Sequence, residues 1–342
     1  MRTSIACGRL SRSMGSSIFL MGPLMARCGE VTVSKPGGCV IGQRPIDFHL
    51  RGLRALGARI EESHGLIRCQ AKRLVGTHIV LDFPSVGATE NLLMAAVLAD
   101  GTTVIENAAR EPEVEDLANF LNAAGASIRG AGSARIEVRG RSELAETSYQ
   151  VIPDRIVAGT VMAMVAAAGG EVRLVGARAD HLGVVLQKLR DAGVRAEVDH
   201  DIITVIGEET PTAIDIRTAP YPGFPTDLQA PFMAFLTIAK GTSIVQESVF
   251  EARFKHVDEL VRMGANVSVD LRTAIVRGVP RLSGARVAAA DLRGGAALVV
   301  AGLAAHGFTE VEGLQHIDRG YEDMAALLRT LGARVSRVSR GE

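Results

Sequence analysis

The sequence predicts an α/β protein of two domains, built from a unit that repeats about every seventy residues. Three observations lead to this prediction. A glycine that ends an amphipathic helical segment recurs five times, a mainly apolar helical segment precedes each copy, and short alternating strands follow the helices. Helices and strands that alternate along the chain are typical of α/β architecture.

The five glycines define the period of the repeat. They lie 68, 68, 71 and 68 residues apart. Each stands where a helix should stop and a strand should follow, because glycine readily adopts the left-handed conformation that closes a helix C-terminus. Amphipathic spacing such as Leu50, Leu53 and Leu56 comes before them. The glycines are Gly57, Gly125, Gly193, Gly264 and Gly332.

The apolar segments are expected to form the interior of each domain, because apolarity all round a helix indicates burial all round it. A glycine ends each segment, and a strand such as 102–105 follows. The first segment follows Arg2, Arg9 and Arg12 and so imitates a signal peptide, but the repeat explains it better as a buried helix. The segments span residues 17–27, 87–99, 159–168, 228–239 and 296–305.

The repeat pattern breaks near residues 150–153. We therefore expect a first domain over residues 1–152 and a second domain over residues 153–342. The chain opens on an apolar helix with no strands before it, so about one repeat unit is expected to be missing upstream of Met1.

Composition argues against several classes of function. Lysine plus arginine and aspartate plus glutamate number 38 each, so no overall charge draws the chain to nucleic acid or an acidic membrane. No apolar stretch approaches the length of a membrane span. The four cysteines show neither a disulfide framework nor zinc-ligand spacing, which suits a reducing cytoplasm. We expect no metal.

An arginine occupies the loop before each amphipathic helix, 11 to 15 residues ahead of the closing glycine. A guanidinium beside a helix N-terminus suits a phosphate or carboxylate, because backbone N–H groups add to its bidentate contact. The alternative is that each arginine pairs with a neighbouring acid, as Arg110 would with Glu111 and Glu113. The five are Arg44, Arg110, Arg178, Arg253 and Arg319.

Two loops contain further candidates, each with two interpretations. Cys39 follows two glycines and precedes Arg44, a setting that suits a reactive thiol, but a free cysteine is commonly a small buried hydrophobe. Asp227 lies in a loop with two prolines and a glycine, directly before an apolar helix. It is either a helix N-cap or part of a rigid, specified site.

Five motifs together resemble the UDP-N-acetylglucosamine 1-carboxyvinyltransferase family. The similarity runs from about residue 9 to the end and includes every repeat. The related 5-enolpyruvylshikimate-3-phosphate synthases share the repeats but lack the Gly-Gly-Cys loop. The resemblance implies a two-domain, inside-out α/β barrel of βαβαββ units, with five of six units present here. The motifs are PGGCVIGQRPID (36–47), SVGAT (85–89), FPTDLQ (224–229), DLR (291–293) and HIDRGY (316–321).

The resemblance implies an enzyme that transfers the enolpyruvyl group of phosphoenolpyruvate to the 3-hydroxyl of UDP-N-acetylglucosamine, in the first committed step of peptidoglycan synthesis. It needs no cofactor and is expected to be a cytoplasmic monomer. Cys39 would donate a proton, and Asp227 would orient or deprotonate the sugar hydroxyl. Arg319, together with Arg44 and Arg253, would hold the phosphate and carboxylate of phosphoenolpyruvate. Substrate contacts are implied for Arg44, Pro45, Ile46, Asp47, Phe48, Ser85, Gly87, Val249, Arg253, Asp291 and Arg293.

The chain departs from the family pattern in three places. The family's N-terminal Lys-Asn pair has no counterpart, Gly15 stands where the family has arginine, and Val157 stands where it usually has glutamate. A longer native protein would account for the first departure. The alternatives are a truncated, non-catalytic paralogue that binds the nucleotide sugar, or a chain that does not fold stably alone.

Overall fold

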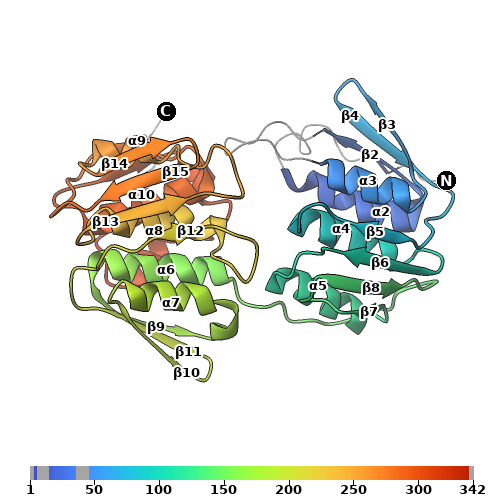
Figure 1. The fold of residues 1–342 in the computed structure, drawn as a ribbon, viewed down its shortest axis with the longest axis horizontal. Coiled ribbons are helices and arrows are strands. Elements are labelled where there is room, and N and C mark those ends of the chain that lie inside the picture. Colours follow the sequence, from blue (N-terminus) through green and yellow to red (C-terminus); the bar gives the residue numbers. More distant parts are fainter. Residues whose placement is uncertain (1–3, 6–14, 36–45, 339–342) are drawn as a thin grey trace. The chain divides into compact units, whose positions relative to one another are not determined.

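The structure is a computed structural model, and it describes residues 4–5, 15–35 and 46–338. The described residues up to Ile152 form one compact unit, and those from Pro153 onward form a second (Figure 1). No helix in the described ranges is long and apolar enough to cross a membrane.

The first unit contains two βαβαββ repeats. In both, the first two strands are parallel and the last two are antiparallel, and the strand orders are β1-β2-β4-β3 and β5-β6-β8-β7. The first repeat comprises β1 (Ser4–Ile5), η1 (Gly15–Leu20), α2 (Met21–Cys28), β2 (Glu30–Ser34), α3 (Asp47–Ala55), β3 (Arg59–Ser63) and β4 (Leu66–Gln70). The second comprises β5 (His78–Val80), α4 (Val86–Ala96), β6 (Thr102–Glu106), α5 (Pro112–Ala123), β7 (Ser127–Arg129) and β8 (Arg135–Arg139).

The second unit contains three repeats, and the middle one has the same strand order, β12-β13-β15-β14. The first repeat comprises α6 (Arg155–Ala168), β9 (Gly170–Val175), η2 (Ala179–His181), α7 (Gly183–Asp191), β10 (Arg195–Asp199) and β11 (Ile202–Gly207). The next comprises β12 (Ile216–Arg217), η3 (Thr226–Leu228), α8 (Gln229–Leu236), β13 (Thr242–Gln246), α9 (Val257–Arg262), β14 (Asn266–Asp270) and β15 (Thr273–Arg277). The last comprises β16 (Arg286–Ala288), α10 (Leu292–Ala304), β17 (Glu310–Glu312), α11 (Leu314–Ile317) and α12 (Met324–Thr330).

The apolar helices form the interior, as predicted. In the second unit α6, α8 and α10 pack against one another (Figure 1), and every residue of α8 is buried. In the first unit α4 is mostly buried and packs against α2. Helix α2 is the most exposed of the five and buries only Met21, Gly22 and Met25. The α/β class is confirmed, and among the described residues three of the five repeats show the full βαβαββ order.

The five closing glycines are also confirmed. Gly57, Gly125, Gly193, Gly264 and Gly332 have φ angles of +95°, +95°, +81°, +93° and +88°, which side chains rarely adopt. Each directly follows the last turn of an amphipathic helix. The repeat could therefore be located from sequence because the chain reverses at a position that favours glycine.

Two sequence expectations are wrong. The first apolar helix was expected to have no strand before it, but β1 precedes it. This strand pairs in parallel with β2, with Ser4 opposite Val31. In the fifth repeat, no strand follows Gly332 within described residues 333–338. Pairing with β2 identifies β1, although its two residues are too short to give an alternating pattern.

A buried polar link joins three helices of the first unit. The Gly22 backbone N–H can only donate, and it bonds Oδ1 of Asn91 at 2.7 Å, so the Asn91 amide nitrogen faces Ile18 O and Nδ1 of His49. Nδ1 of His49 must then accept, which requires a neutral imidazole. Burial lowers the pKa of His49 to about 4, although the charge of Asp47 raises it.

Candidate active site

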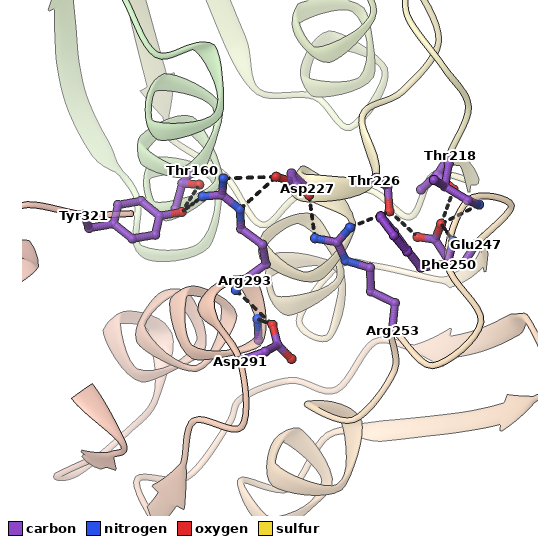
Figure 2. A network of polar contacts seen from close by, with 12 residues as sticks. Thr160, Thr218, Thr226, Asp227, Glu247, Phe250, Arg253, Asp291, Arg293 and Tyr321 are labelled. Atoms are coloured by element: carbon purple, nitrogen blue, oxygen red, sulfur yellow. Dashed lines mark hydrogen bonds and ion pairs between the residues drawn. The ribbon is translucent and has the colours of Figure 1, made fainter. Parts of the chain in front are cut away.

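Asp227 lies at the centre of a polar network in the second unit (Figure 2). It belongs to the short helix η3, in the turn that leads into α8. Its side chain remains 38% exposed, so a ligand can reach the carboxylate. The alternative that Asp227 caps α8 is wrong, because the described structure gives that helix no side-chain cap and both oxygens of Asp227 accept from arginines.

Arg253 holds one oxygen of this carboxylate. Its Nη2 donates to Oδ1 of Asp227 at 2.5 Å and its Nη1 donates to the hydroxyl of Thr226 at 2.9 Å. The guanidinium lies 4.9 Å from the ring centroid of Phe250, within cation–π range. Its side chain is 5% exposed, and within the described ranges its buried Nε has no hydrogen-bond partner.

Arg293 holds the other oxygen. Its Nε and Nη2 donate to Oδ2 of Asp227 at 3.2 and 3.0 Å, and its Nη1 donates to the hydroxyl of Tyr321 at 3.2 Å. That hydroxyl lies 2.9 Å from Oγ1 of Thr160 on α6. Arg293 is the second residue of α10, and Asp291 caps this helix by accepting from the backbone N–H of Arg293 and Gly294. The helix start therefore aims the guanidinium at Asp227.

The two arginines keep Asp227 ionised. Desolvation raises the pKa of Asp227, but the charges of Arg253 and Arg293 and their hydrogen bonds outweigh it, so the pKa lies below its usual value. The three side chains together carry one net positive charge. This arrangement suits an anionic ligand, with a carboxylate beside it that can accept a hydrogen bond from a hydroxyl.

Comparison with known proteins agrees with this chemistry. The family model for EPSP synthase (3-phosphoshikimate 1-carboxyvinyltransferase) matches residues 2–328. A UDP-N-acetylglucosamine 1-carboxyvinyltransferase of Caldanaerobacter subterraneus is 54% identical over 96% of this chain and 79% of its own length. One from Symbiobacterium thermophilum is 56% identical over 96% of this chain and 75% of its own. The chain belongs to the EPSP synthase family.

Solved structures of this family have the same fold. The enolpyruvyl transferase NikO from Streptomyces tendae has a TM-score of 0.87 at 26% identity, covering 96% of this chain and 79% of that one. EPSP synthase from Acinetobacter baumannii has a TM-score of 0.67 at 20% identity, covering 92% of this chain and 77% of its own; at that identity the likeness concerns the fold alone.

The family's predicted site residues in the second unit fall into two groups. Asp227, Arg253 and Arg293 meet directly, with Asp291 capping α10 and Val249 in the loop after β13. Arg319 lies on an exposed turn after α11, and it forms no ion pair with any described residue. Arg178, another loop arginine, pairs with neighbouring Asp180 at 2.6 Å, as the alternative interpretation expected.

In the first unit, the predicted substrate-binding residues that the structure describes lie at the N-termini of two helices, α3 and α4. Ile46 is the N-cap residue of α3, and Asp47 and Phe48 begin that helix. Ser85 caps α4 by accepting from the backbone N–H of Ala88 at 3.3 Å. A Cβ on Gly87 would meet the ring of Phe19 at 3.0 Å and that of His49 at 3.4 Å, so packing requires a small residue there. Cys39, Arg44 and Pro45 lie outside the described residues.

Sequence reasoning missed Tyr321, Thr160, Thr226 and Glu247 as members of the network. Tyr321 ends the HIDRGY motif, and Thr226 stands beside Asp227 in FPTD, so both were close to motifs already identified. Thr160 lies 161 residues before Tyr321, and local patterns give no signal of their contact. Glu247 could have been noticed as a carboxylate in phase with the buried positions of a strand.

Proposed function

We propose that this chain transfers the enolpyruvyl group of phosphoenolpyruvate to the 3-hydroxyl of UDP-N-acetylglucosamine and releases phosphate, as the first committed step of peptidoglycan synthesis. Support comes from relatives of that name that are more than half identical over 96% of the chain. The observation that carries the proposal is the Asp227 carboxylate held between Arg253 and Arg293. Such a site places a hydroxyl-orienting group beside cations that attract a phosphate or carboxylate.

In the proposed reaction the sugar 3-hydroxyl oxygen bonds to the central carbon of phosphoenolpyruvate as the methylene carbon takes a proton. The former methylene carbon, now a methyl group, then loses a proton, and the bond between the central carbon and the phosphate oxygen breaks. The products are the enol ether and inorganic phosphate. Cys39 would supply the first proton and Asp227 would orient the hydroxyl and accept its proton as the new bond forms. Its lowered pKa makes Asp227 a weak base before attack, which favours orientation as its ground-state role.

Arg253, Arg293 and Arg319 would hold the phosphate and carboxylate of phosphoenolpyruvate together with Arg44. Contacts to the nucleotide sugar would come from Pro45, Ile46, Asp47, Phe48, Ser85, Gly87 and Val249, with Asp291 acting through α10. The protein would work in the cytoplasm as a monomer, without a metal or cofactor.

The test is phosphate release in the presence of both substrates. Purified protein should release phosphate only when phosphoenolpyruvate and UDP-N-acetylglucosamine are both present, and Cys39→Ser should lower the rate at least about 100-fold. Cys28→Ser, which changes an exposed free cysteine, is the matched control and should keep full activity. Saturable UDP-N-acetylglucosamine binding with no phosphate release would instead favour the non-catalytic binder.

A further inference from the structure

Glu247 is a buried carboxylate to which the proposed reaction assigns no role. It directly follows β13, whose residues alternate exposed and buried, so its side chain falls on the buried side. It is 1% exposed. Burial of a carboxylate is costly unless hydrogen bonds compensate for the lost water. Among the residues that the structure describes, no lysine or arginine forms an ion pair with it.

Hydrogen bonds satisfy Glu247 on both oxygens (Figure 2). Oε1 accepts from the hydroxyl of Thr218 at 2.9 Å and from the backbone N–H of Val249 and Phe250 at 2.8 and 3.1 Å. Oε2 accepts from the hydroxyl of Thr226 at 2.9 Å. One carboxylate therefore fixes both the loop after β13 and the residue before Asp227.

The directions of these bonds connect Glu247 to Arg253. The hydroxyl proton of Thr226 points to Oε2 of Glu247, so the oxygen of Thr226 is free to accept from Nη1 of Arg253. Nη2 of the same planar guanidinium donates to Asp227. Phe250, whose backbone Glu247 holds, supplies the ring against this guanidinium. Glu247 thus holds both partners of Arg253 on this side: the Thr226 hydroxyl that accepts from Nη1, and Phe250, whose ring lies against the guanidinium.

We propose that Glu247 is a positioning residue that acts through Thr226 to orient Arg253, and through it the Asp227 carboxylate, for attack by the sugar hydroxyl. This inference rests on the proposed function, since it concerns the same site. Glu247 itself touches no reacting atom. Its loss should slow turnover while leaving nucleotide-sugar binding in place.

The isosteric change Glu247→Gln separates the two sides of the carboxylate. Two backbone N–H groups on the Oε1 side can only donate, so the amide oxygen must take that place and the NH₂ group must face Thr226. The loop after β13 is then retained, but Thr226 loses its acceptor. Thr226→Val removes the same link from the other end, and Thr103→Val is the matched control, because the buried Thr103 hydroxyl has no hydrogen-bond partner within the described part of the chain.

Steady-state phosphate release and calorimetric binding of UDP-N-acetylglucosamine test the proposal. Glu247→Gln and Thr226→Val should each lower kcat about tenfold, as loss of a hydrogen bond to a charged group predicts, and leave the sugar-nucleotide Kd within twofold. The double variant should be no slower than Thr226→Val, and Thr103→Val should match the wild type. Additive losses in the double variant, or an unchanged kcat in Thr226→Val, would overturn the positioning role.

If Glu247→Gln fails to fold, kcat of Thr226→Val alone decides whether Glu247 has the positioning role. A wild-type protein that releases no phosphate would count against the proposed function instead.

Discussion

Arg293 donates two hydrogen bonds to Oδ2 of Asp227, at 3.2 and 3.0 Å, across a separation of 66 residues. One partner opens α10 and the other lies in the turn before α8. Because these two helices pack together inside the second unit, the pair is held by the core rather than by a local loop. Arg253 holds the other oxygen of the carboxylate, so its orientation is fixed from two sides.

Asp227→Asn should reduce phosphate release about 100-fold or more, the scale expected on losing an acid–base group. An amide oxygen can face only one arginine, so the amide nitrogen would face the donors of the other. The measurement is the initial rate with both substrates at saturation. Asp215→Asn is the control, because its amide oxygen can still accept from the backbone N–H of Ile244, and it should keep wild-type turnover. If Asp227→Asn releases phosphate as fast as Asp215→Asn and the wild type, Asp227 has no role in the reaction.

Tyr321→Phe should lower kcat several-fold and cost about 1 kcal/mol of unfolding free energy. The change removes the hydroxyl that joins Thr160 to Arg293 and leaves the ring. Denaturant unfolding and phosphate release provide the two readouts. Tyr149→Phe removes a hydroxyl bonded to Asp116 in the first unit and should leave kcat unchanged. A Tyr321→Phe protein with wild-type kcat would show that Arg293 needs no support from this hydroxyl.

His49 should make stability depend on pH. Burial lowers its pKa from 6.5 to about 4 in the folded state, so the unfolded chain takes up the proton first as the pH falls. Stability is therefore full above about pH 6.5 and is lost progressively toward pH 4. In His49→Asn an amide oxygen can replace Nδ1 as acceptor for Asn91, without titrating.

The expected outcome is a difference between wild type and His49→Asn in how far stability falls from pH 7 to pH 4.5. The wild type should lose about 2 kcal/mol more than the variant. Urea unfolding at the two pH values measures this. Parallel losses in both proteins would mean that His49 does not contribute to the acid sensitivity.

Gly22→Ala should destabilise the first unit by about 3 kcal/mol. A Cβ there would lie 2.2 Å from the carbonyl oxygen and 2.6 Å from Oδ1 of Asn91, so α2 and α4 would have to separate. Gly183→Ala is the matched control, because a Cβ at that position meets no atom within 4 Å. Thermal unfolding should show a lower midpoint for Gly22→Ala only. Two equal midpoints would show that the helices can shift at little cost.

Much of the fold could be predicted from sequence because its signals are local. Apolar runs marked the buried helices, and the glycines with positive φ marked where the amphipathic helices end. The two-residue strand β1 was missed because it depends on pairing with β2, not on a pattern of its own. Asp227 and Arg253 were found in two loops of the same repeat from their loop positions, but nothing local showed that they touch.

The sequence by itself determined the repeat, the helices that fill each core, and the family to which the motifs point. Periodicity and backbone conformation are encoded over a few residues, so they can be predicted from the sequence without knowledge of the packing. Only the tertiary structure decided that Asp227 bridges two arginines instead of capping a helix. It also decided that Thr160 supports Arg293 through the Tyr321 hydroxyl, and that Glu247 supports Arg253 through Thr226. These contacts depend on how α6, α8 and α10 pack, and residue spacing along one chain does not specify that packing.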